Sequence, residues 1–268
     1  MLKKIVRKIL SEFVYRIRYI FSSYGKKLFD RNESCTYTFG NEIFCSDKMT
    51  FEKIARKYAD KTVTYWRDQS SYSLVDYFPE RYSNQRKMLH SDFISLYEKP
   101  PVLMDIGCAS GEWTAEMASD CECIDGFEYS DKMVHTAQDK YSCINNVHFY
   151  QGDARTLQFK KIYDGAMILG MLMYIEDEND FCGILKNVHD NVEQNGYICT
   201  KDTLNCENKE KVFLYNKKTG YNSVYWSQDK YYEMFEKCGF VLKKEILLDE
   251  VKTRRMHFIA RGAIWQRK

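Results

Sequence analysis

The sequence predicts an α/β fold with a mostly parallel, doubly wound sheet, and three observations support this prediction. Short apolar runs alternate with helical patterns over residues 100–268, with brief turns between them. A glycine-bearing turn at 107–111 joins the first of these runs to a helix. The last two runs follow each other across LLDEVKTRR without a helix, which indicates an antiparallel hairpin at one edge of the sheet. Strand–helix alternation with short turns is typical of right-handed crossover connections.

Each element is predicted from a local pattern. The expected strands are 102–106, 122–128, 147–151, 163–169, 196–202, 241–248 and 256–261. The expected helices are 111–119, 130–140, 178–194 and 228–238. Two prolines, Pro100 and Pro101, punctuate the chain just before the first strand. We therefore expect a main domain over 100–268 and an N-terminal helical cap or lid over 31–99.

The first thirty residues predict a separate element, a basic amphipathic helix. Apolar residues recur at three-four spacing, and lysines and arginines lie mostly on the other face. Charges interrupt the apolar run too often for a spanning helix. Residues 1–27 therefore predict one of three contacts: peripheral binding to an anionic membrane at its inner face, self-association, or packing on the protein's own body.

Composition narrows the function classes. The formal charge of +2 on 268 residues gives no basis for binding nucleic acid. The ten cysteines are scattered through apparent strands and helices, which is typical of free thiols in a reducing cytoplasm. The pair Cys121 and Cys123 lacks a histidine partner at zinc spacing, so no metal is expected. Abundant Lys, Asn, Tyr and Ile are typical of an AT-rich bacterial genome.

The turn Gly107-Cys108-Ala109-Ser110-Gly111 is small enough for a ligand to approach the backbone closely. Its G-x-A-x-G spacing is not the G-x-G-x-x-G of a dinucleotide site. Asp105 stands two residues before the turn, where its charge would oppose a pyrophosphate. The carboxylate instead suits a cationic ligand that carries an ammonium and a sulfonium.

Two further strand ends carry acids. Glu128 ends the second strand in GFEYS and is placed to accept hydrogen bonds from both hydroxyls of a ribose. Tyr129 can lay its ring against an adenine. Asp153 in QGDA can accept from the adenine amino group, and the Ala154 amide can serve a ring nitrogen. Three acids at successive strand ends would surround the crevice where open α/β sheets bind ligands.

The segments VLMDIGCASG, GFEYSDKM and FYQGDA, in this order and spacing, resemble the class I S-adenosylmethionine-dependent methyltransferases. The similarity covers residues 100–200 well and 200–268 by pattern only. The resemblance implies a seven-stranded sheet whose last strand is antiparallel, with S-adenosyl-L-methionine as the cofactor. It places Asp105 and the Gly107–Gly111 turn near the methionine part, Glu128 at the ribose, and Asp153 with Ala154 at the adenine. Ala109 departs from the family, in which many members have glycine.

The segment after the fourth strand, ILGMLMYIEDEND, lies beside the methyl group in such folds. Gly170, Met171 and Tyr174 are therefore candidate pocket residues, and Tyr174 is also a candidate catalytic residue. Asp202, at the end of the fifth strand, is a candidate general base or metal ligand, with a solvated loop aspartate as the alternative. His257, on a late strand, is the histidine to test as a base.

Arg81 lies in an aromatic stretch before the main domain, where methyltransferases of this type often carry a lid. Its planar guanidinium suits the cofactor carboxylate, and a surface charge is the alternative. A second aromatic run at 214–226 would suit a sugar ring or another amphipathic substrate.

These patterns predict a cytoplasmic methyltransferase acting on a small-molecule or glycan oxygen, including phosphate-linked groups of a surface polysaccharide. Two alternatives stay open. One is a non-catalytic fold member that uses the cofactor pocket in a partner complex. The other is an enzyme that transfers a different group from the same cofactor.

Overall fold

The computed structural model describes residues 36–39, 42–57, 79–207, 209–217, 220–252 and 257–268. The predicted helix at 1–30 and most of the aromatic stretch that follows it lie outside the described residues, so the expected membrane or self-contact stays a prediction. Among the described residues, no helix has the length and apolar character needed to cross a membrane.

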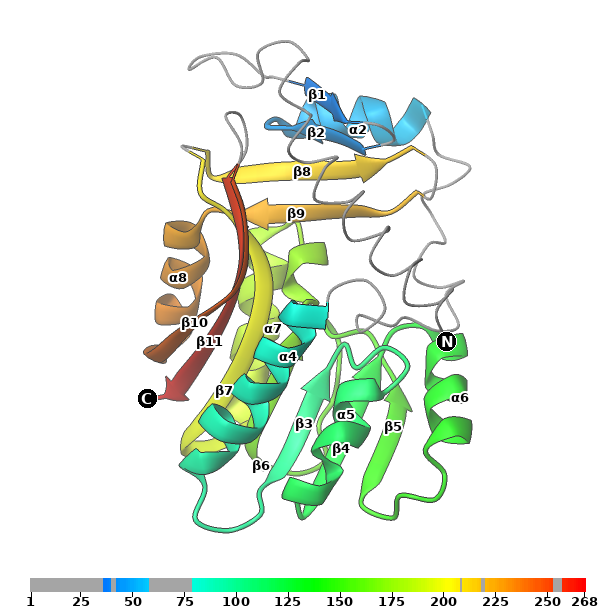
Figure 1. Ribbon diagram of the computed structural model, residues 1–268, viewed down its shortest axis with the longest axis vertical. Coiled ribbons are helices and arrows are strands. Elements are labelled where there is room, and N and C mark those ends of the chain that lie inside the picture. Colours follow the sequence, from blue (N-terminus) through cyan, green and yellow to red (C-terminus); the bar gives the residue numbers. More distant parts are fainter. Residues whose placement is uncertain (1–35, 40–41, 58–78, 208, 218–219, 253–256) are drawn as a thin grey trace.

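A seven-stranded sheet forms the body of the molecule (Figure 1), in the order β10-β11-β7-β6-β3-β4-β5. Its strands are β3 (Val102–Ile106), β4 (Cys123–Glu128), β5 (Val147–Gln151), β6 (Tyr163–Leu169), β7 (Val192–Asn205), β10 (Phe240–Lys252) and β11 (His257–Arg267). The strands from β5 to β7 are parallel, and β11 is antiparallel to both of its neighbours. The predicted fold class, with its antiparallel last strand, is confirmed.

Helices cover both faces of this sheet. They are α5 (Glu112–Glu116), α6 (Asp131–Lys140), α7 (Glu178–Asn191) and α8 (Gln228–Lys237), with short turns η5 (Met117–Asp120) and η6 (Leu172–Tyr174). Side-chain caps start three of the helices, because Ser130, Asp177 and Ser227 each accept a backbone N–H of the first turn. The cap at Ser130 starts α6 close behind Glu128, the predicted site residue at the end of β4.

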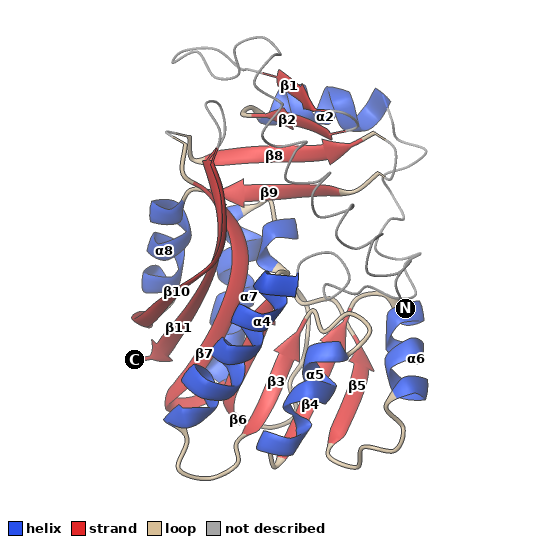
Figure 2. Ribbon diagram, viewed as in Figure 1, coloured by secondary structure: helices blue, strands red, loops and turns tan. Residues whose placement is uncertain are grey.

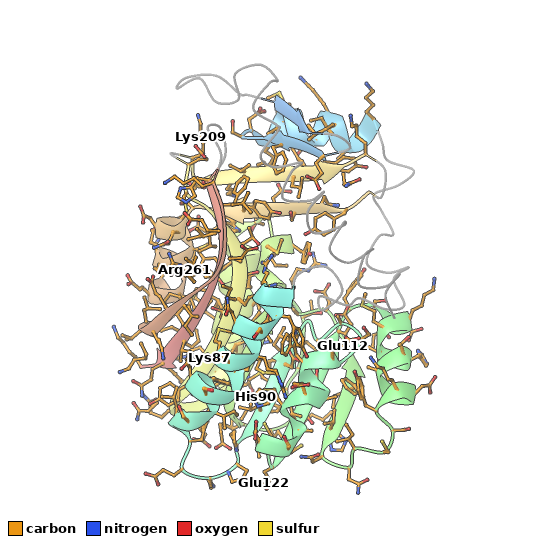
Figure 3. All side chains as sticks on the ribbon, in the orientation of Figure 1. Lys87, His90, Glu112, Glu122, Lys209 and Arg261 are labelled. Atoms are coloured by element: carbon orange, nitrogen blue, oxygen red, sulfur yellow. The ribbon has the colours of Figure 1, made fainter. Side chains whose placement is uncertain are left out.

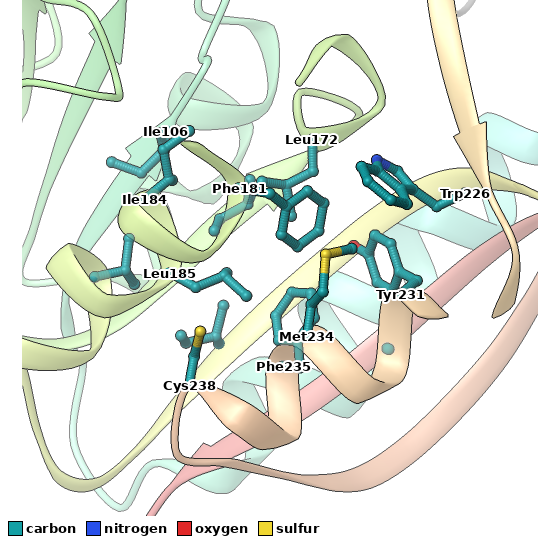
Figure 4. Packing of buried hydrophobic residues seen from close by; sticks show 14 of the residues in the cluster. Ile106, Leu172, Phe181, Ile184, Leu185, Trp226, Tyr231, Met234, Phe235 and Cys238 are labelled. Atoms are coloured by element: carbon teal, nitrogen blue, oxygen red, sulfur yellow. The ribbon is translucent and has the colours of Figure 1, made fainter. Parts of the chain in front are cut away.

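The two faces have separate apolar cores. On one face, Phe181 of α7 and Phe235 of α8 pack together with Trp226 (Figure 4). The Phe235 and Trp265 rings stack with centroids 4.3 Å apart. On the other face, η3 (Met88–Phe93) and α6 cover a second cluster that includes Cys199. Adjacent residues of β7 therefore contact opposite cores. This alternation determines which side chains of β7 can reach the site.

The N-terminal segment packs along the second face. It comprises α4 (Pro79–Lys87), η3 and η4 (Ile94–Leu96), and it runs beside β7 and α5 (Figure 2). His90 of η3 contacts Asp120 of η5 and lies 3.6 Å from Glu116 of α5, measured from Nε2 to Oε1 (Figure 3). These contacts fix η3 against α5 and η5, while the start of α4 is held at the cavity by the Tyr82–Trp113 ring stack and the Arg81–Thr203 hydrogen bond.

A second sheet was not expected from the sequence. It has the order β1-β2-β8-β9, from β1 (Thr36–Phe39), β2 (Glu42–Cys45), β8 (Lys211–Asn216) and β9 (Asn222–Trp226), with α2 (Lys48–Lys57) on it. It lies across the carboxyl ends of the large sheet (Figure 1). The cap is therefore not purely helical and not purely N-terminal, because half of its sheet comes from the segment after β7.

Candidate active site

A cavity of about 530 Å³ runs from the carboxyl ends of the parallel strands to the four-stranded sheet. Nine of the ten predicted cofactor residues line it: Arg81, Asp105, Gly107, Cys108, Glu128, Tyr129, Asp153, Ala154 and Gly170. Gly111, the tenth, closes the turn behind it. The same cavity reaches Tyr174, Tyr221 and Tyr225 on the side of the small sheet. A single space therefore adjoins both a nucleotide-sized acidic crevice and an aromatic wall.

The turn after β3 is held by main-chain bonds and by one acid. Gly107 N–H donates to Phe127 O at 2.8 Å, and Gly107 has φ +76°. A Cβ on Gly107 would lie 2.7 Å from Met171 Cβ, so only glycine fits there. Ala109 has φ +51°, in the left-handed region that favours glycine. The alanine that departs from the family pattern therefore costs more than the mild change its extra methyl suggests.

Glu128 connects two loops. Its Oε2 accepts the Ala109 N–H at 3.0 Å, and its Oε1 accepts the Ser130 N–H at 2.8 Å. Burial raises the pKa of this carboxyl, and the backbone N–H bonds oppose that rise. Each oxygen has a further lone pair, so the carboxylate that shapes the turn can also accept from a ligand in the cavity.

Asp105 is 1% exposed at the end of β3, and its Oδ2 accepts the Thr114 hydroxyl at 2.7 Å. Burial raises the pKa of Asp105 to about 7, and the hydrogen bond from Thr114 opposes that rise. A buried acid with a single neutral partner suits a cationic ligand, which would restore its ionised form.

The third acid is engaged by a neighbour. Arg155 Nε lies 2.9 Å from Asp153 Oδ1 and Arg155 Nη2 lies 2.5 Å from Oδ2. This arginine lowers the pKa of Asp153. Asp153 keeps its place at the cavity wall, with its carboxylate ionised and oriented by Arg155.

The structure separates the three predicted catalytic residues. Tyr174 of η6 lines the cavity, and its hydroxyl lies 3.0 Å from that of Tyr221. Asp202 lies on the opposite face of β7, where it accepts from Met173 N–H at 3.1 Å and Tyr231 Oη at 2.8 Å. His257 pairs with Glu250 at 2.7 Å at the hairpin end of the last two strands. Neither Asp202 nor His257 is among the described residues that line the cavity.

The face of β7 explains the position of Asp202. Side chains alternate along a strand, so Lys201 and Thr203 face α4 while Asp202 faces α8. Burial raises the pKa of Asp202, and its two hydrogen bonds tie η6 to α8. Asp202 therefore does not face this cavity, in which the sequence made it a candidate base or metal ligand. It is instead a buried acid that anchors η6 to α8.

Two residues that sequence reasoning missed line the cavity. Lys201 is 6% exposed, and within the described part of the chain its Nζ makes no hydrogen bond or ion pair. Burial and then the charge of Arg81 lower the pKa of Lys201. Gln85 of α4 is 1% exposed, and its Oε1 has no donor among the described residues. The alternation of side chains along ICTKDTL was the available signal for Lys201, because it places Lys201 and Asp202 on opposite faces of the strand.

One cluster outside the cavity has metal-ligand character. Ligand atoms of Cys123, Asp125 and His148 lie within 4.8 Å of one another at the other end of β4 and β5. The fold therefore brings His148 close to Cys123, although the sequence around Cys121 and Cys123 has no histidine at zinc spacing. Lys161 Nζ lies 3.0 Å from Asp125 Oδ2, and this ammonium supplies the positive charge that the carboxylate needs.

Replacing Gly111 with alanine is expected to lower the free energy of unfolding by about 1–3 kcal/mol. Gly111 has φ +81°, and a Cβ there would lie 2.6 Å from Phe149 Cζ. Gly183→Ala is the matched control, because Gly183 is in the α7 helix with nothing within 4 Å of an added Cβ. That variant should gain about 0.5–1 kcal/mol. Urea denaturation measures both, and equal effects would contradict the assigned backbone conformation.

Comparisons with known proteins agree with this geometry. Residues 103–196 match a family model described as a methyltransferase domain. The chain is 24% identical over 199 residues to a carboxy-S-adenosyl-L-methionine synthase of Helicobacter pylori (strain P12), covering 68% of this chain and 74% of that protein.

Solved structures share the fold. A S-adenosylmethionine-dependent methyltransferase of Methanosarcina mazei has a TM-score of 0.57 at 16% identity, covering 67% of this chain and 96% of its own. The N-methyltransferase NodS of Bradyrhizobium japonicum WM9, in complex with S-adenosyl-L-homocysteine, has a TM-score of 0.54 at 12% identity, covering 78% and 96%.

The fold and the acid-lined cavity define an α/β enzyme that holds a nucleoside-bearing cofactor at the carboxyl edge of its sheet. The domain match identifies residues 103–196 as a methyltransferase domain, and S-adenosyl-L-methionine is the cofactor that this domain and the shared fold indicate. The residues present fit that cofactor. Asp105 offers a buried carboxylate to a cation, and Gln85 Oε1 is a buried acceptor without a donor among the described residues.

Proposed function

We propose that this protein transfers a methyl group to an oxygen of a small-molecule acceptor held between the cofactor edge and the four-stranded sheet. The observation that supports this most directly is the continuity of the cavity, because the acids of the large sheet and the tyrosines of the small sheet line one space. An acceptor can therefore reach the cofactor without leaving the enclosed volume.

The cofactor residues keep the roles that the sequence suggests. In the proposal, Glu128 accepts from the ribose hydroxyls, Tyr129 lies against the adenine, and Asp153 with Ala154 meets its edge. Asp105 pairs with the ammonium of the methionine part, with the Gly107–Gly111 turn beneath it. Arg81 donates to Thr203 Oγ1 at 3.1 Å and lines the cavity, which supports a pairing with the cofactor carboxylate.

When bound, the cofactor supplies a methyl carbon activated by its sulfonium. The chain's own residues orient the acceptor and exclude water. Tyr174 and Tyr221 form a hydroxyl pair at the cavity wall, and their rings meet edge to face with centroids 5.9 Å apart. Such a wall fits the hydroxyl-bearing face of a sugar ring, which keeps a saccharide or a polysaccharide building block among the acceptors to test first.

A second candidate reaction is transfer of a carboxyl-bearing group, with a carboxylated cofactor as the product. The relative in Helicobacter pylori is named for that product, and the guanidinium of Arg81 lines the cavity, where it suits a carboxylate.

Methyl transfer is tested with methyl-deuterated S-adenosyl-L-methionine and a set of sugars, sugar nucleotides and aromatic alcohols. We expect S-adenosyl-L-homocysteine to form together with an acceptor that gains the mass of one labelled methyl group. If the cofactor itself gains the mass of a carboxyl group instead, the second candidate holds. If the wild-type chain binds no cofactor, neither reaction stands.

A further inference from the structure

Lys201 has an unusual position for a lysine. It lies on β7 level with Leu169, the last residue of β6, and its side chain crosses the next residue, Gly170. A Cβ on Gly170 would lie 3.1 Å from Lys201 Nζ, so the amine occupies the space above that glycine. Gly170 lines the cavity beside Met171 and Tyr174, where the acids of the large sheet meet the tyrosines of the small sheet and where the proposed function places the methyl transfer.

No carboxylate of the described residues pairs directly with the amine, and Asp202 of the same strand acts on it only through its charge. Within the described residues, Nζ makes no hydrogen bond or ion pair, and Lys201 is 6% exposed. A charged ammonium buried without a partner is costly, so burial and the nearby guanidinium of Arg81 favour the neutral amine. A neutral amine has a lone pair and can accept a proton.

We propose that Lys201 is the general base of the methyl transfer, with its Nζ accepting the proton that the acceptor loses. This inference rests on the proposed function. The acceptor oxygen forms a bond to the methyl carbon, the carbon–sulfur bond breaks with its electron pair left on sulfur, and the acceptor's proton goes to Lys201 Nζ.

The charges favour this assignment. Before transfer, the positive charge is on the sulfonium and Lys201 is neutral, so the two groups do not repel each other. After transfer, sulfur is neutral and the charge is on Lys201. One positive charge therefore moves within the cavity and no new charge is created there, which limits the electrostatic cost of the step.

Other charged groups surround Lys201 and bear on its titration. Arg81 from α4 lowers its pKa, Asp202 of its own strand raises it, and Asp105 from β3 and Glu42 from β2 line the same cavity. Asp105 also titrates near neutral pH, so its protonation weakens the binding of any ligand with an ammonium. A test of Lys201 must therefore compare two ligands that both carry that ammonium.

S-adenosyl-L-methionine and S-adenosyl-L-homocysteine differ in the sulfonium charge and the methyl group. The test measures both dissociation constants by calorimetry between pH 6 and pH 8.5, for wild type, Lys201→Met and the surface control Lys244→Met. In wild type, the dissociation constant of S-adenosyl-L-methionine should rise relative to that of S-adenosyl-L-homocysteine as the pH falls. The limit is about tenfold per pH unit below the pKa of Lys201, because the protonated amine repels the sulfonium.

The Lys201→Met variant should flatten this ratio, while Lys244→Met should keep it. A wild-type ratio that does not change with pH, or a change that survives in Lys201→Met, would overturn the assignment of the base. Failure of both ligands to bind wild type at every pH would instead overturn the proposed function.

A second readout needs no variant. Competitive acetylation of the wild-type chain with acetic anhydride, read by mass spectrometry, reports the neutral fraction of each lysine. Lys201 should react with a midpoint near neutral pH and should be protected by S-adenosyl-L-homocysteine. A midpoint in the ordinary lysine range would overturn the proposal even if Lys201→Met did not fold.

Discussion

Replacing Glu128 with alanine is expected to weaken the binding of S-adenosyl-L-homocysteine by about a hundredfold or more. Two hydrogen bonds from a ribose diol to an ionised carboxylate contribute about 3 kcal/mol together, and each 1.4 kcal/mol is tenfold. The variant also loses the acceptors for the Ala109 and Ser130 N–H groups, so the turn that faces the methionine part loses a support. Calorimetric titration of the purified chain measures the change.

The matched control is Glu116→Ala. Glu116 belongs to α5, and its carboxylate pairs with Arg86 outside the lining of the cavity. Its affinity for S-adenosyl-L-homocysteine should stay within about threefold of wild type, since surface ion pairs contribute little. Comparable losses in both variants would mean that the effect comes from destabilised folding, and an unchanged Glu128→Ala would remove the ribose assignment.

The central strands of the large sheet were predictable because they are short apolar runs that are buried on both faces. Val102–Ile106 and Tyr163–Leu169 are confirmed residue for residue. Each run stands between turn signals, and each helix begins at a capping residue or a glycine. Local sequence is enough where one segment determines its own structure.

The small sheet depends on contacts that no local window contains. Its inner strands, β2 and β8, come from residues 42–45 and 211–216, and Phe44 pairs with Leu214 across that distance. The aromatic residues of the later strands suggested a substrate-binding insertion, and that expectation did not specify strands. The three acids of the large sheet line the cavity because parallel strands end at one edge.

Lys201 shows the limit of motif reasoning at the site. Asp202 was a candidate base because carboxylates at strand ends often act as bases. The choice between two adjacent residues depends on which face of β7 is turned to the cavity, and that is set by the packing of α8 against one side and α4 against the other. Gln85 carries no motif at all, and only its burial without a donor among the described residues identifies it.

Asp105→Asn is expected to stabilise the ligand-free protein above pH 7 while weakening its cofactor binding. Burial raises the pKa of Asp105 from 3.8 to about 7 in the folded state. The folded chain therefore holds this proton more tightly than the unfolded chain does. The stabilising effect of that proton is complete below about pH 4 and is lost as the pH rises through 7.

A gap of about three pKa units corresponds to about 4 kcal/mol as an upper limit, since one unit is 1.4 kcal/mol. Asparagine has no charge to bury and keeps an acceptor for the Thr114 hydroxyl. Between pH 5 and pH 8 the free energy of unfolding of the variant, relative to wild type, should rise by about 2–3 kcal/mol, because about two of the three units lie above pH 5. Asp139→Asn on the exposed side of α6 should show no such rise.

Binding should change in the opposite direction. The ammonium of the methionine part would lose its ionised partner in Asp105→Asn. The affinity of this variant for S-adenosyl-L-homocysteine at pH 8 should therefore fall by tenfold or more, because a charged hydrogen bond contributes about 1.5–3 kcal/mol.

Urea denaturation at the two pH values and calorimetry at pH 8 give both quantities from one preparation. A variant that is more stable and binds as well as wild type would show that Asp105 does not meet the cation. A variant that is less stable at pH 8 would show that its carboxylate is already compensated in the ligand-free protein. The expected pair of results, greater stability and weaker binding, would show that the buried carboxylate of Asp105 destabilises the ligand-free protein and binds the cationic cofactor.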